Sequence, residues 1–305
     1  AQPRPTFQYY ERQEKRTEMN RLPLRAALCA AIATLLALFA VACGSSDETT
    51  TTDEKQTTQA PNPQAEAAVA DYREYLEQNT AELVAKTKPF VAAVVAGDVA
   101  EAKKLYPAAR IPYERIEPVA KAFGDLDPRI DAREDGVPAD EWGGFHRIEK
   151  ALWVEDTTRG MAPVAEQLQA DVEELDEKVK TVELDAVQIA NGANELLAEV
   201  SGSKITGEEE RYSHIDLVDF EANVEGSLAA FESVKPLLDP VDADLSGEIE
   251  ADFKAVFNSL QPYRRENGFV SYTTLTDSDT RTLAREIDIL AEELSQVPAV
   301  IGGQD

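Results

Sequence analysis

The spacing of apolar residues predicts α-helices along most of the chain. In residues 64–96, apolar side chains recur every three or four positions, which is the period of a helix with one buried face. The same spacing returns in residues 99–123, 145–155, 157–182, 183–200, 215–238, 245–260 and 280–297. Because the alternating pattern of β-strands is almost absent, we predict an all-α fold of about eight helices joined by short loops, in one domain or two bundle-like halves.

Prolines and acidic residues mark the expected interruptions of this pattern. Pro107 and Pro112 predict kinks or new turns inside residues 99–123. Residues 124–141 combine Gly, Pro and Asp and predict an acidic loop before the next helical run. We therefore expect a long, proline-kinked helical segment followed by a turn-rich connection.

Residues 242–253 begin like the calcium-binding loop of an EF-hand. The twelfth position of such a loop needs a bidentate glutamate, but this chain has Phe253 there. We interpret the segment instead as the start of a helix, with Asp244 or Ser246 as its cap.

The region before the helical pattern is typical of a secretory signal. Met19 is followed by two arginines and an apolar run, residues 26–41, with small residues directly before Cys43. This order predicts a bacterial lipoprotein signal with lipid on Cys43, and a plain secretory signal is the alternative. We predict four segments: an upstream extension (1–18), a lipoprotein signal peptide (19–42), a polar tether (43–63) and a helical domain (64–305). The domain is then expected outside the cytoplasm, anchored to the outer face of the cell membrane or in the periplasm.

Composition limits the possible partners and sites. The 305 residues include 58 Asp and Glu against 30 Lys and Arg, a formal net charge of −28 at pH 7. Such a charge repels nucleic acid and attracts cations. Cys29 and Cys43 are the two cysteines, and the first lies in the predicted signal peptide. Neither a disulfide framework nor a cysteine zinc site is expected.

His146 and Glu149 are the first candidates for a metal site. They stand three residues apart on a predicted helix, so their side chains point within about 60° of each other and can reach one cation. An imidazole nitrogen with carboxylate oxygens suits iron, manganese, zinc or copper, whereas calcium or magnesium would use oxygens alone. The alternative interpretation is that His146 faces solvent or caps a turn.

Further carboxylates could complete such a site. The sequence offers a glutamate pair, an aspartate group and an acidic run before the second histidine: Glu114 and Glu117; Asp125, Asp127 and Asp131; Glu208, Glu209 and Glu210 before His214. Acidic residues on a solvated face would look the same in a chain of this charge. A zinc peptidase helix needs two histidines four residues apart, and His146 and His214 lie in different segments.

Four blocks of the sequence resemble the imelysin-like family. In chain order they are YPAARIPYERIEPVAKAFGDLDPRIDARE, GFHRIEKALW, ITGEEERYSHIDLVDFEANVEGS and LAEELSQVPA. Within the family, the branch most similar to these blocks contains extracytoplasmic components of bacterial iron transport, and the resemblance extends over residues 64–305. It implies an all-α fold of two four-helix-bundle lobes, with a metal site in the groove between them.

The resemblance also implies a cargo, a ligand set and partners. The implied metal is iron, Fe(II) or Fe(III), with zinc or copper as possible replacements in vitro. Carried over block by block, the implied ligands are His146, Glu149, Glu114, Glu117, Asp131 and Glu209, with Glu208 as the alternative to Glu209 and His214 beside that block. The implied partners are an iron permease and a haem peroxidase of the same uptake system, and we expect a monomer that binds no nucleic acid. Some members carry a cupredoxin-like domain, but no copper-type His/Cys/Met set is present here.

These observations leave more than one function open. The leading hypothesis is a lipid-anchored component that binds iron and delivers it to a membrane permease, without enzymatic activity. A metallopeptidase, with Glu149 or Glu117 as general base on a metal-bound water, is the alternative. Binding of another ligand, such as an anionic polysaccharide or haem, is a third possibility.

Overall fold

The computed structural model describes residues 62–303, and it confirms the all-α fold. The predicted upstream extension, signal peptide and most of the tether lie outside the described residues. The first part of the described chain contains α2 (Pro63–Ala96), α3 (Val99–Ile116), η1 (Glu117–Phe123), α4 (Leu126–Asp131), α5 (Gly144–Trp153) and α6 (Ala162–Val179). The second part contains α7 (Ala186–Gly202), η2 (Lys204–Thr206), α8 (Asp216–Leu238), α9 (Ala243–Leu260), η3 (Gln261–Tyr263), β1 (Arg264–Arg265), β2 (Gly268–Phe269), η4 (Tyr272–Thr274), α10 (Asp277–Leu294) and α11 (Val297–Gly302).

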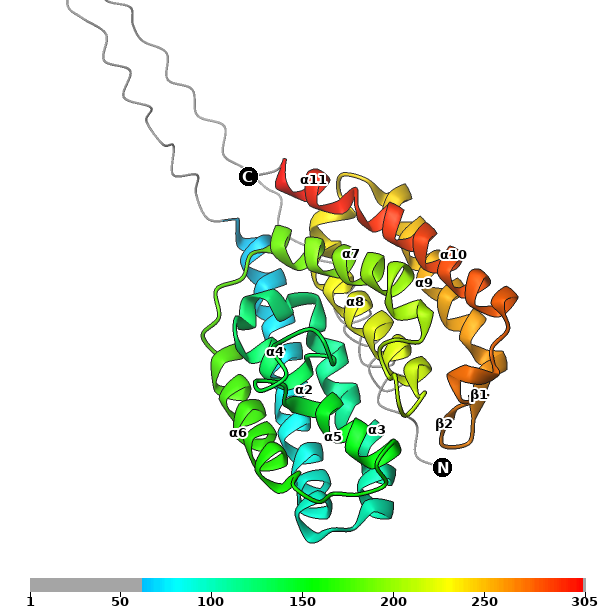
Figure 1. Cartoon of the computed structure of the whole chain (residues 1–305). Helices are drawn as coiled ribbons and strands as arrows, with labels where there is room; N and C mark the ends of the chain where they lie inside the picture. Colours follow the sequence, from blue (N-terminus) through cyan, green and yellow to red (C-terminus); the bar gives the residue numbers. More distant parts are fainter. Residues whose placement is uncertain (1–61, 304–305) are drawn as a thin grey trace, which may run out of the picture. The chain divides into compact units, whose positions relative to one another are not determined.

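The helices pack in two groups that follow the chain order. In the first group α2 contacts α3 and α6, and α5 packs against α6 and α3. In the second, α7 contacts α8 and α10, while α9 packs against α10 and α8. Figure 1 shows the two groups as a blue-to-green set and a green-to-red set. Contacts of α8 with α3 and α2 join them, so residues from both groups can meet near α3.

Two glycines allow this close contact between the groups. Gly226 on α8 lies against the backbone of α3, where a Cβ would be 2.2 Å from the carbonyl oxygen of Arg115. Gly192 on α7 lies against η1, where a Cβ would be 1.9 Å from the carbonyl oxygen of Pro118. Any larger side chain would force the helices apart, since real Cβ atoms do not approach a carbonyl so closely. The glycines therefore set the distance at which α7 and α8 face α3 and η1.

The prediction that residues 124–141 form an acidic loop was wrong in part. Residues 126–131 form α4, and its Leu126 and Ile130 are buried four residues apart on one face. The element has only six residues, so its periodicity is too short to detect in the sequence. This helix matters for the site because it ends at Asp131.

Two other local features are the path of residues 99–123 and the start of α9. Pro107 and Pro112 lie inside α3, which continues to Ile116 before the chain tightens into the 3₁₀-helix η1. The cap of α9 is Asp242, whose carboxylate accepts a hydrogen bond from the Leu245 amide at 3.0 Å, so the predicted caps were wrong. Ser246, one of those predicted caps, donates its hydroxyl to Asp239 instead.

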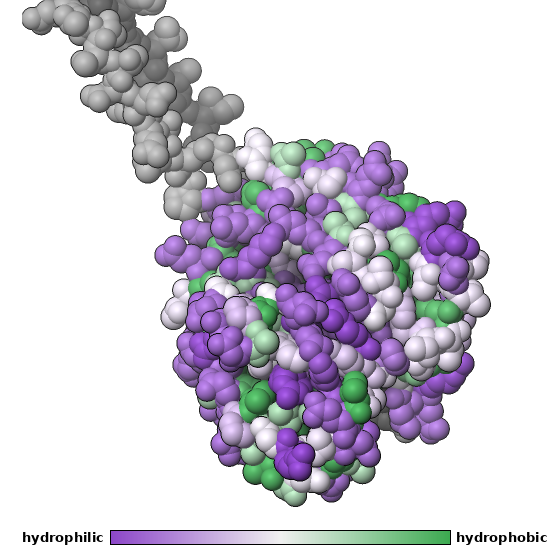
Figure 2. Space-filling view, in the orientation of Figure 1, coloured by the Kyte–Doolittle hydropathy of each residue, from purple (hydrophilic) through white to green (hydrophobic). Residues whose placement is uncertain are grey.

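Burial separates the apolar interior from a polar surface. Apolar residues on one side of α2, such as Leu76, Leu83 and Phe90, are fully buried. The face in Figure 2 is mostly hydrophilic, with single apolar residues scattered over it. Among the described residues, no helix combines the length and the apolar character that crossing a membrane requires. Several charged residues, including Arg110, Glu114 and Glu149, are nevertheless fully buried, and they lie in one cluster.

Candidate metal centre

The first turn of α5 places His146 close to the end of α4. Gly144 has a φ of 69°, and a Cβ on it would lie 2.2 Å from the carbonyl oxygen of Ile130. Only glycine adopts this conformation without strain and leaves room for the α4 backbone. As a result, Asp131 at the end of α4 faces the imidazole of His146 across a short distance.

The Nε2 atom of His146 faces two carboxylates. It lies 3.5 Å from Oδ1 of Asp131 and 3.7 Å from Oε1 of Glu209. The His146 side chain is 2% exposed, and Nε2 has no hydrogen-bond partner in the described structure. The three candidate ligand atoms of Asp131, His146 and Glu209 lie within 4.8 Å of one another. A buried ring nitrogen without a hydrogen bond is costly unless a proton or a cation uses it, and the two carboxylates beside Nε2 would stabilise either one.

The other ring nitrogen of His146 faces Glu149. The Nδ1 atom is 3.1 Å from Oε2 of Glu149, and Oε1 of Glu149 accepts hydrogen bonds from the backbone amides of Tyr212 (2.9 Å) and Ser213 (2.7 Å). Both oxygens of Glu149 are therefore engaged. A carboxylate that binds one nitrogen of a histidine typically orients the ring and leaves the other nitrogen for the metal.

His146 and Glu149 also form a second candidate group with Glu210. Their ligand atoms likewise lie within 4.8 Å of one another, and all three residues are buried. Glu210 already accepts hydrogen bonds from Tyr106 at 3.1 Å and from the hydroxyl of Ser213. Nδ1 of His146, the ring nitrogen that faces Glu149, already has this contact, whereas the first group offers Nε2, which has no hydrogen bond, so the second group is the less available of the two.

Arg110 lies at the centre of the carboxylates and was not predicted from the sequence. Its guanidinium donates to Glu114 and Asp131, and it lies 3.1 Å from Glu210 and 3.2 Å from Asp219. The side chain is fully buried on α3. The sequence shows Arg110 four residues before Glu114, which is equally typical of an exposed ion pair on a helix.

Lys204, also not predicted, neutralises the glutamate pair of α3 and η1. Its Nζ atom lies 2.8 Å and 2.7 Å from the two carboxylate oxygens of Glu117 and 3.3 Å from Glu114. The side-chain amide of Asn223 donates to the same carboxylates, at 2.9 Å to Glu114 and 2.7 Å to Glu117. The two glutamates implied as ligands thus pair with protein cations and lie outside both groups that could hold a metal.

The remaining acidic candidates, Glu208 and Glu209, differ in how far their side chains are exposed. Glu209 is 3% exposed and faces His146, whereas the neighbouring Glu208 is 42% exposed and lies 3.6 Å from Arg133. His214 is in neither candidate group. Its φ is 59°, its amide donates to Glu210 and its carbonyl accepts from Tyr272, so its backbone shapes the turn that carries Glu209 and Glu210.

The pKa shifts describe a site in which protons and protein cations balance the carboxylates. Burial and Arg110 lower the pKa of His146, but the carboxylates around it outweigh both and hold it well above its ordinary value. Burial raises the pKa of Glu209, yet Lys204 and His146 keep it well below the usual range. Burial dominates at Glu210 and raises its pKa well above normal. His146 therefore keeps its proton to a higher pH than a free imidazole, and any cation that used Nε2 would have to displace that proton.

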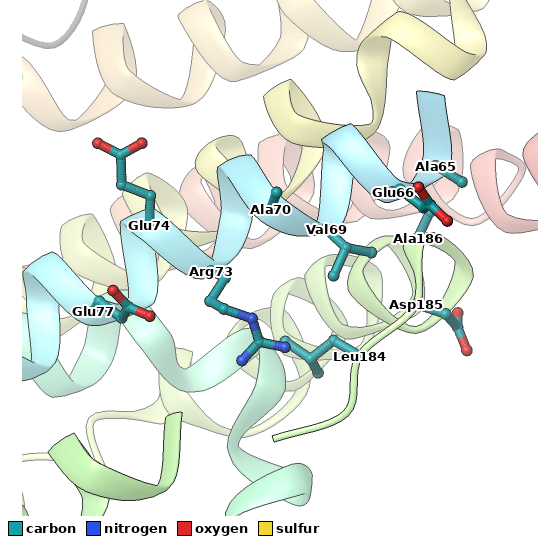
Figure 3. A pocket seen from close by; sticks show the side chains of 10 residues that line it. All are labelled: Ala65, Glu66, Val69, Ala70, Arg73, Glu74, Glu77, Leu184, Asp185 and Ala186. Atoms are coloured by element: carbon teal, nitrogen blue, oxygen red, sulfur yellow. The ribbon is translucent and has the colours of Figure 1, made fainter. Parts of the chain in front are cut away.

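A separate cavity of about 510 Å³ lies away from this cluster. It is bordered by the start of α2 and the connection from α6 to α7 (Figure 3). Arg73 lines it and donates hydrogen bonds to the carbonyl oxygens of Val179 (2.6 Å) and Val182 (2.5 Å). Its charge thus holds this connection in place, and the cavity does not include the buried imidazole.

The chain is similar to an established protein family and to curated proteins over most of its length. The imelysin family model, whose label also classes it with peptidases, matches residues 68–297. The chain is 45% identical over 239 residues to the iron uptake system component EfeO of Escherichia coli strain K12, and equally to that of Shigella flexneri. The E. coli O1:K1 relative is 44% identical over the same length. These alignments cover 77% of this chain and 64% of each relative, so the chain spans less than two thirds of the relatives' length.

The family match covers most of the described residues, from the first turns of α2 to the start of α11. It includes every residue of the cluster around His146. This extent, together with the identity to the curated relatives, shows that the chain belongs to the imelysin family.

Proposed function

We propose that the protein is an iron-binding component of a bacterial iron uptake system. The observation that carries this proposal is the buried Nε2 atom of His146, which has no hydrogen bond and faces the carboxylates of Asp131 and Glu209. The similarity to proteins named as iron uptake components supports it from a second side. Iron is the cargo in this proposal, captured at the cluster and passed on.

The donor set fits iron better than a soft metal. One imidazole nitrogen with carboxylate oxygens suits Fe(II) and Fe(III), and the same atoms accept zinc or copper in vitro. Residues 62–303 contain no cysteine, so no thiolate competes for a soft ion there. The formal charge of −28 raises the concentration of cations near the surface, although salt screens this beyond about 8–10 Å.

Within this proposal, the residues implied as ligands take different roles. His146, Asp131 and Glu209 hold the ion. Glu149 orients the imidazole through Nδ1, because both of its oxygens already accept hydrogen bonds. Glu114 and Glu117 bind protein cations and set the charge around the site, as described above.

The same geometry argues against the peptidase alternative. A general base must have a carboxylate oxygen free to take a proton from a metal-bound water. Both oxygens of Glu149 accept hydrogen bonds, and both oxygens of Glu117 contact Lys204. Either carboxylate would have to give up one of these contacts before it took a proton from water, so we favour binding over peptidase activity.

In this proposal the protein acts outside the cytoplasm as a monomer, held at the membrane by lipid on Cys43. It delivers iron to a membrane permease that works with a haem peroxidase. Delivery requires reversible binding, which a site balanced by internal cations and protons can provide.

Titration of the metal-free helical domain with Fe(II) under anoxic conditions tests the proposal. Isothermal calorimetry with elemental analysis should give about one iron per chain, and His146→Ala should weaken binding more than about 100-fold. The matched control is His214→Asn, which removes the other histidine and tolerates its positive φ. Equal iron affinity in His146→Ala and His214→Asn would reject the site. Peptide cleavage that is lost with chelator and in Glu149→Gln would support the peptidase instead.

A further inference from the structure

The guanidinium of Arg110 contacts both carboxylate oxygens that face Nε2 of His146. Oδ1 of Asp131, which lies 3.5 Å from Nε2 of His146, also accepts a hydrogen bond from Nη1 of Arg110. Oε1 of Glu209 lies 3.7 Å from Nε2 of His146 and 3.6 Å from Nη2 of Arg110. The guanidinium and a metal ion on this side of the ring would therefore use the same two oxygens.

The other contacts of the guanidinium are with residues other than Asp131, His146 and Glu209. Nε of Arg110 lies 3.1 Å from Glu210, and Nη2 lies 3.2 Å from Asp219 and also contacts Glu114. These partners come from α3, from the turn before α8 and from α8 itself. A planar group with five donors can keep such contacts while it gives up others. Arg110 could thus leave Asp131 and Glu209 and remain paired.

We propose that Arg110 is an internal counter-cation that a metal ion displaces from Asp131 and Glu209. The inference rests on the proposed function. In the metal-free protein, Arg110 neutralises carboxylates that would otherwise repel one another in a buried site. When the ion binds, it takes over that role and the guanidinium keeps Glu210 and Asp219. Binding therefore costs the loss of protein ion pairs, which weakens affinity and favours release to a partner.

This role predicts a gain of affinity, which damage to the fold would not produce. Arg110→Met keeps an unbranched chain of similar length and removes the competing charge. Without repulsion between the guanidinium and the ion, Zn(II) and Fe(II) should bind at least about tenfold more tightly and dissociate more slowly. Thermal unfolding should show the metal-free variant destabilised, and added Zn(II) should raise its midpoint more than that of the wild type.

Arg115→Met is the matched control. Arg115 lies on the same helix and is mostly buried, but it pairs with Glu225 at 2.7 Å, away from the histidine. Its replacement removes one positive charge from α3 and should leave metal affinity unchanged. Arg110→Lys is the second variant, for the case that Arg110→Met does not fold. It keeps the charge without the planar fork, so it should bind metal more tightly than the wild type by a smaller factor.

Calorimetry with Zn(II) and anoxic Fe(II), and a crystal structure with Zn(II), decide between the outcomes. Arg110 should no longer hydrogen-bond to Asp131 in the zinc-loaded wild type. If the wild type binds metal but Arg110→Met or Arg110→Lys binds equally or more weakly, the counter-cation role is wrong and the proposed function stands. The role is also wrong if Arg110 keeps its contact with Asp131 beside the bound ion. If the wild type binds neither ion at His146, both proposals fail.

Discussion

Two pairs of residues with the same spacing have opposite surroundings in this protein. His146 and Glu149 are three residues apart, and so are Glu114 and Glu117. The first pair leaves one ring nitrogen without a hydrogen bond, whereas the second is neutralised by Lys204. Spacing along a helix therefore shows which side chains share a direction. Whether these side chains are free to bind a metal depends on lysine and arginine side chains from distant parts of the chain, which can pair with them.

Removing the carboxylates on the Nε2 side should have the largest effect on metal binding. The double variant Asp131→Asn and Glu209→Gln keeps the shape of both side chains and removes both negative ligands. We expect affinity for Zn(II) and Fe(II) to fall by more than about 100-fold, because two charged oxygens of the proposed site are lost. Calorimetry measures this loss, and circular dichroism checks the fold.

The matched control for this variant is Glu114→Gln with Glu117→Gln. It removes the same number of charges from the glutamate pair that contacts Lys204 and Asn223. If the comparison between the pairs is correct, the control retains most of its affinity. A control that loses as much affinity as the first variant would make the total charge, and not the ligand position, the decisive factor.

Glu149→Gln should have the next largest effect. The glutamine side chain has one acceptor oxygen where the glutamate has two. It therefore cannot accept hydrogen bonds both from Nδ1–H of His146 and from the backbone amides of Tyr212 and Ser213, because its NH₂ group only donates. We expect affinity to fall about 10–100-fold, the range for partners that orient a metal-binding histidine. A complete loss, equal to that of His146→Ala, would make Glu149 a direct ligand.

The helical fold could be predicted from the sequence, whereas the balance of charges in the site could not. Amphipathic periodicity is local, so helices such as α2 and α8 were found close to their true ends. The short helix α4 and the cap of α9 were not, because six residues or one carboxylate give no periodic signal. Arg110 and Lys204 were missed for a different reason. Lys204 meets Glu114 across 90 residues of sequence, and no local pattern indicates such a contact.

Through His146, a rise in pH should lower the stability of the metal-free fold and raise the affinity for metal. The folded-state pKa of His146 is raised above its ordinary value of 6.5. Its contribution to the stability of the metal-free fold is thus fully present below the unfolded pKa and is lost as the pH rises through the folded pKa. Metal binding needs the neutral ring, so affinity should rise over that same interval.

Urea unfolding and Zn(II) calorimetry between pH 5 and 9 measure the two trends. His146→Gln has no titrating ring, so both trends should become shallower in this variant. Parallel trends in the wild type, with stability and affinity rising together, would show that His146 does not take up the proton that the metal replaces.

The smallest effect is expected for Glu117→Gln alone. Its carboxylate is 13% exposed and contacts Lys204, and burial raises its pKa well above the usual range. The amide would release Lys204, whose Nζ atom lies 3.6 Å from Oε1 of Glu209 and could then pair with it more closely. Because this strengthens only the pairing of Lys204 with Glu209, metal affinity should fall by less than about threefold.

Glu208→Gln, on an exposed side chain beside Glu209, is the control for the loss of one charge. A loss as large as that of Glu149→Gln would return Glu117 to the ligand set that the family resemblance implies, and Lys204 would then be a cation that the metal has to displace.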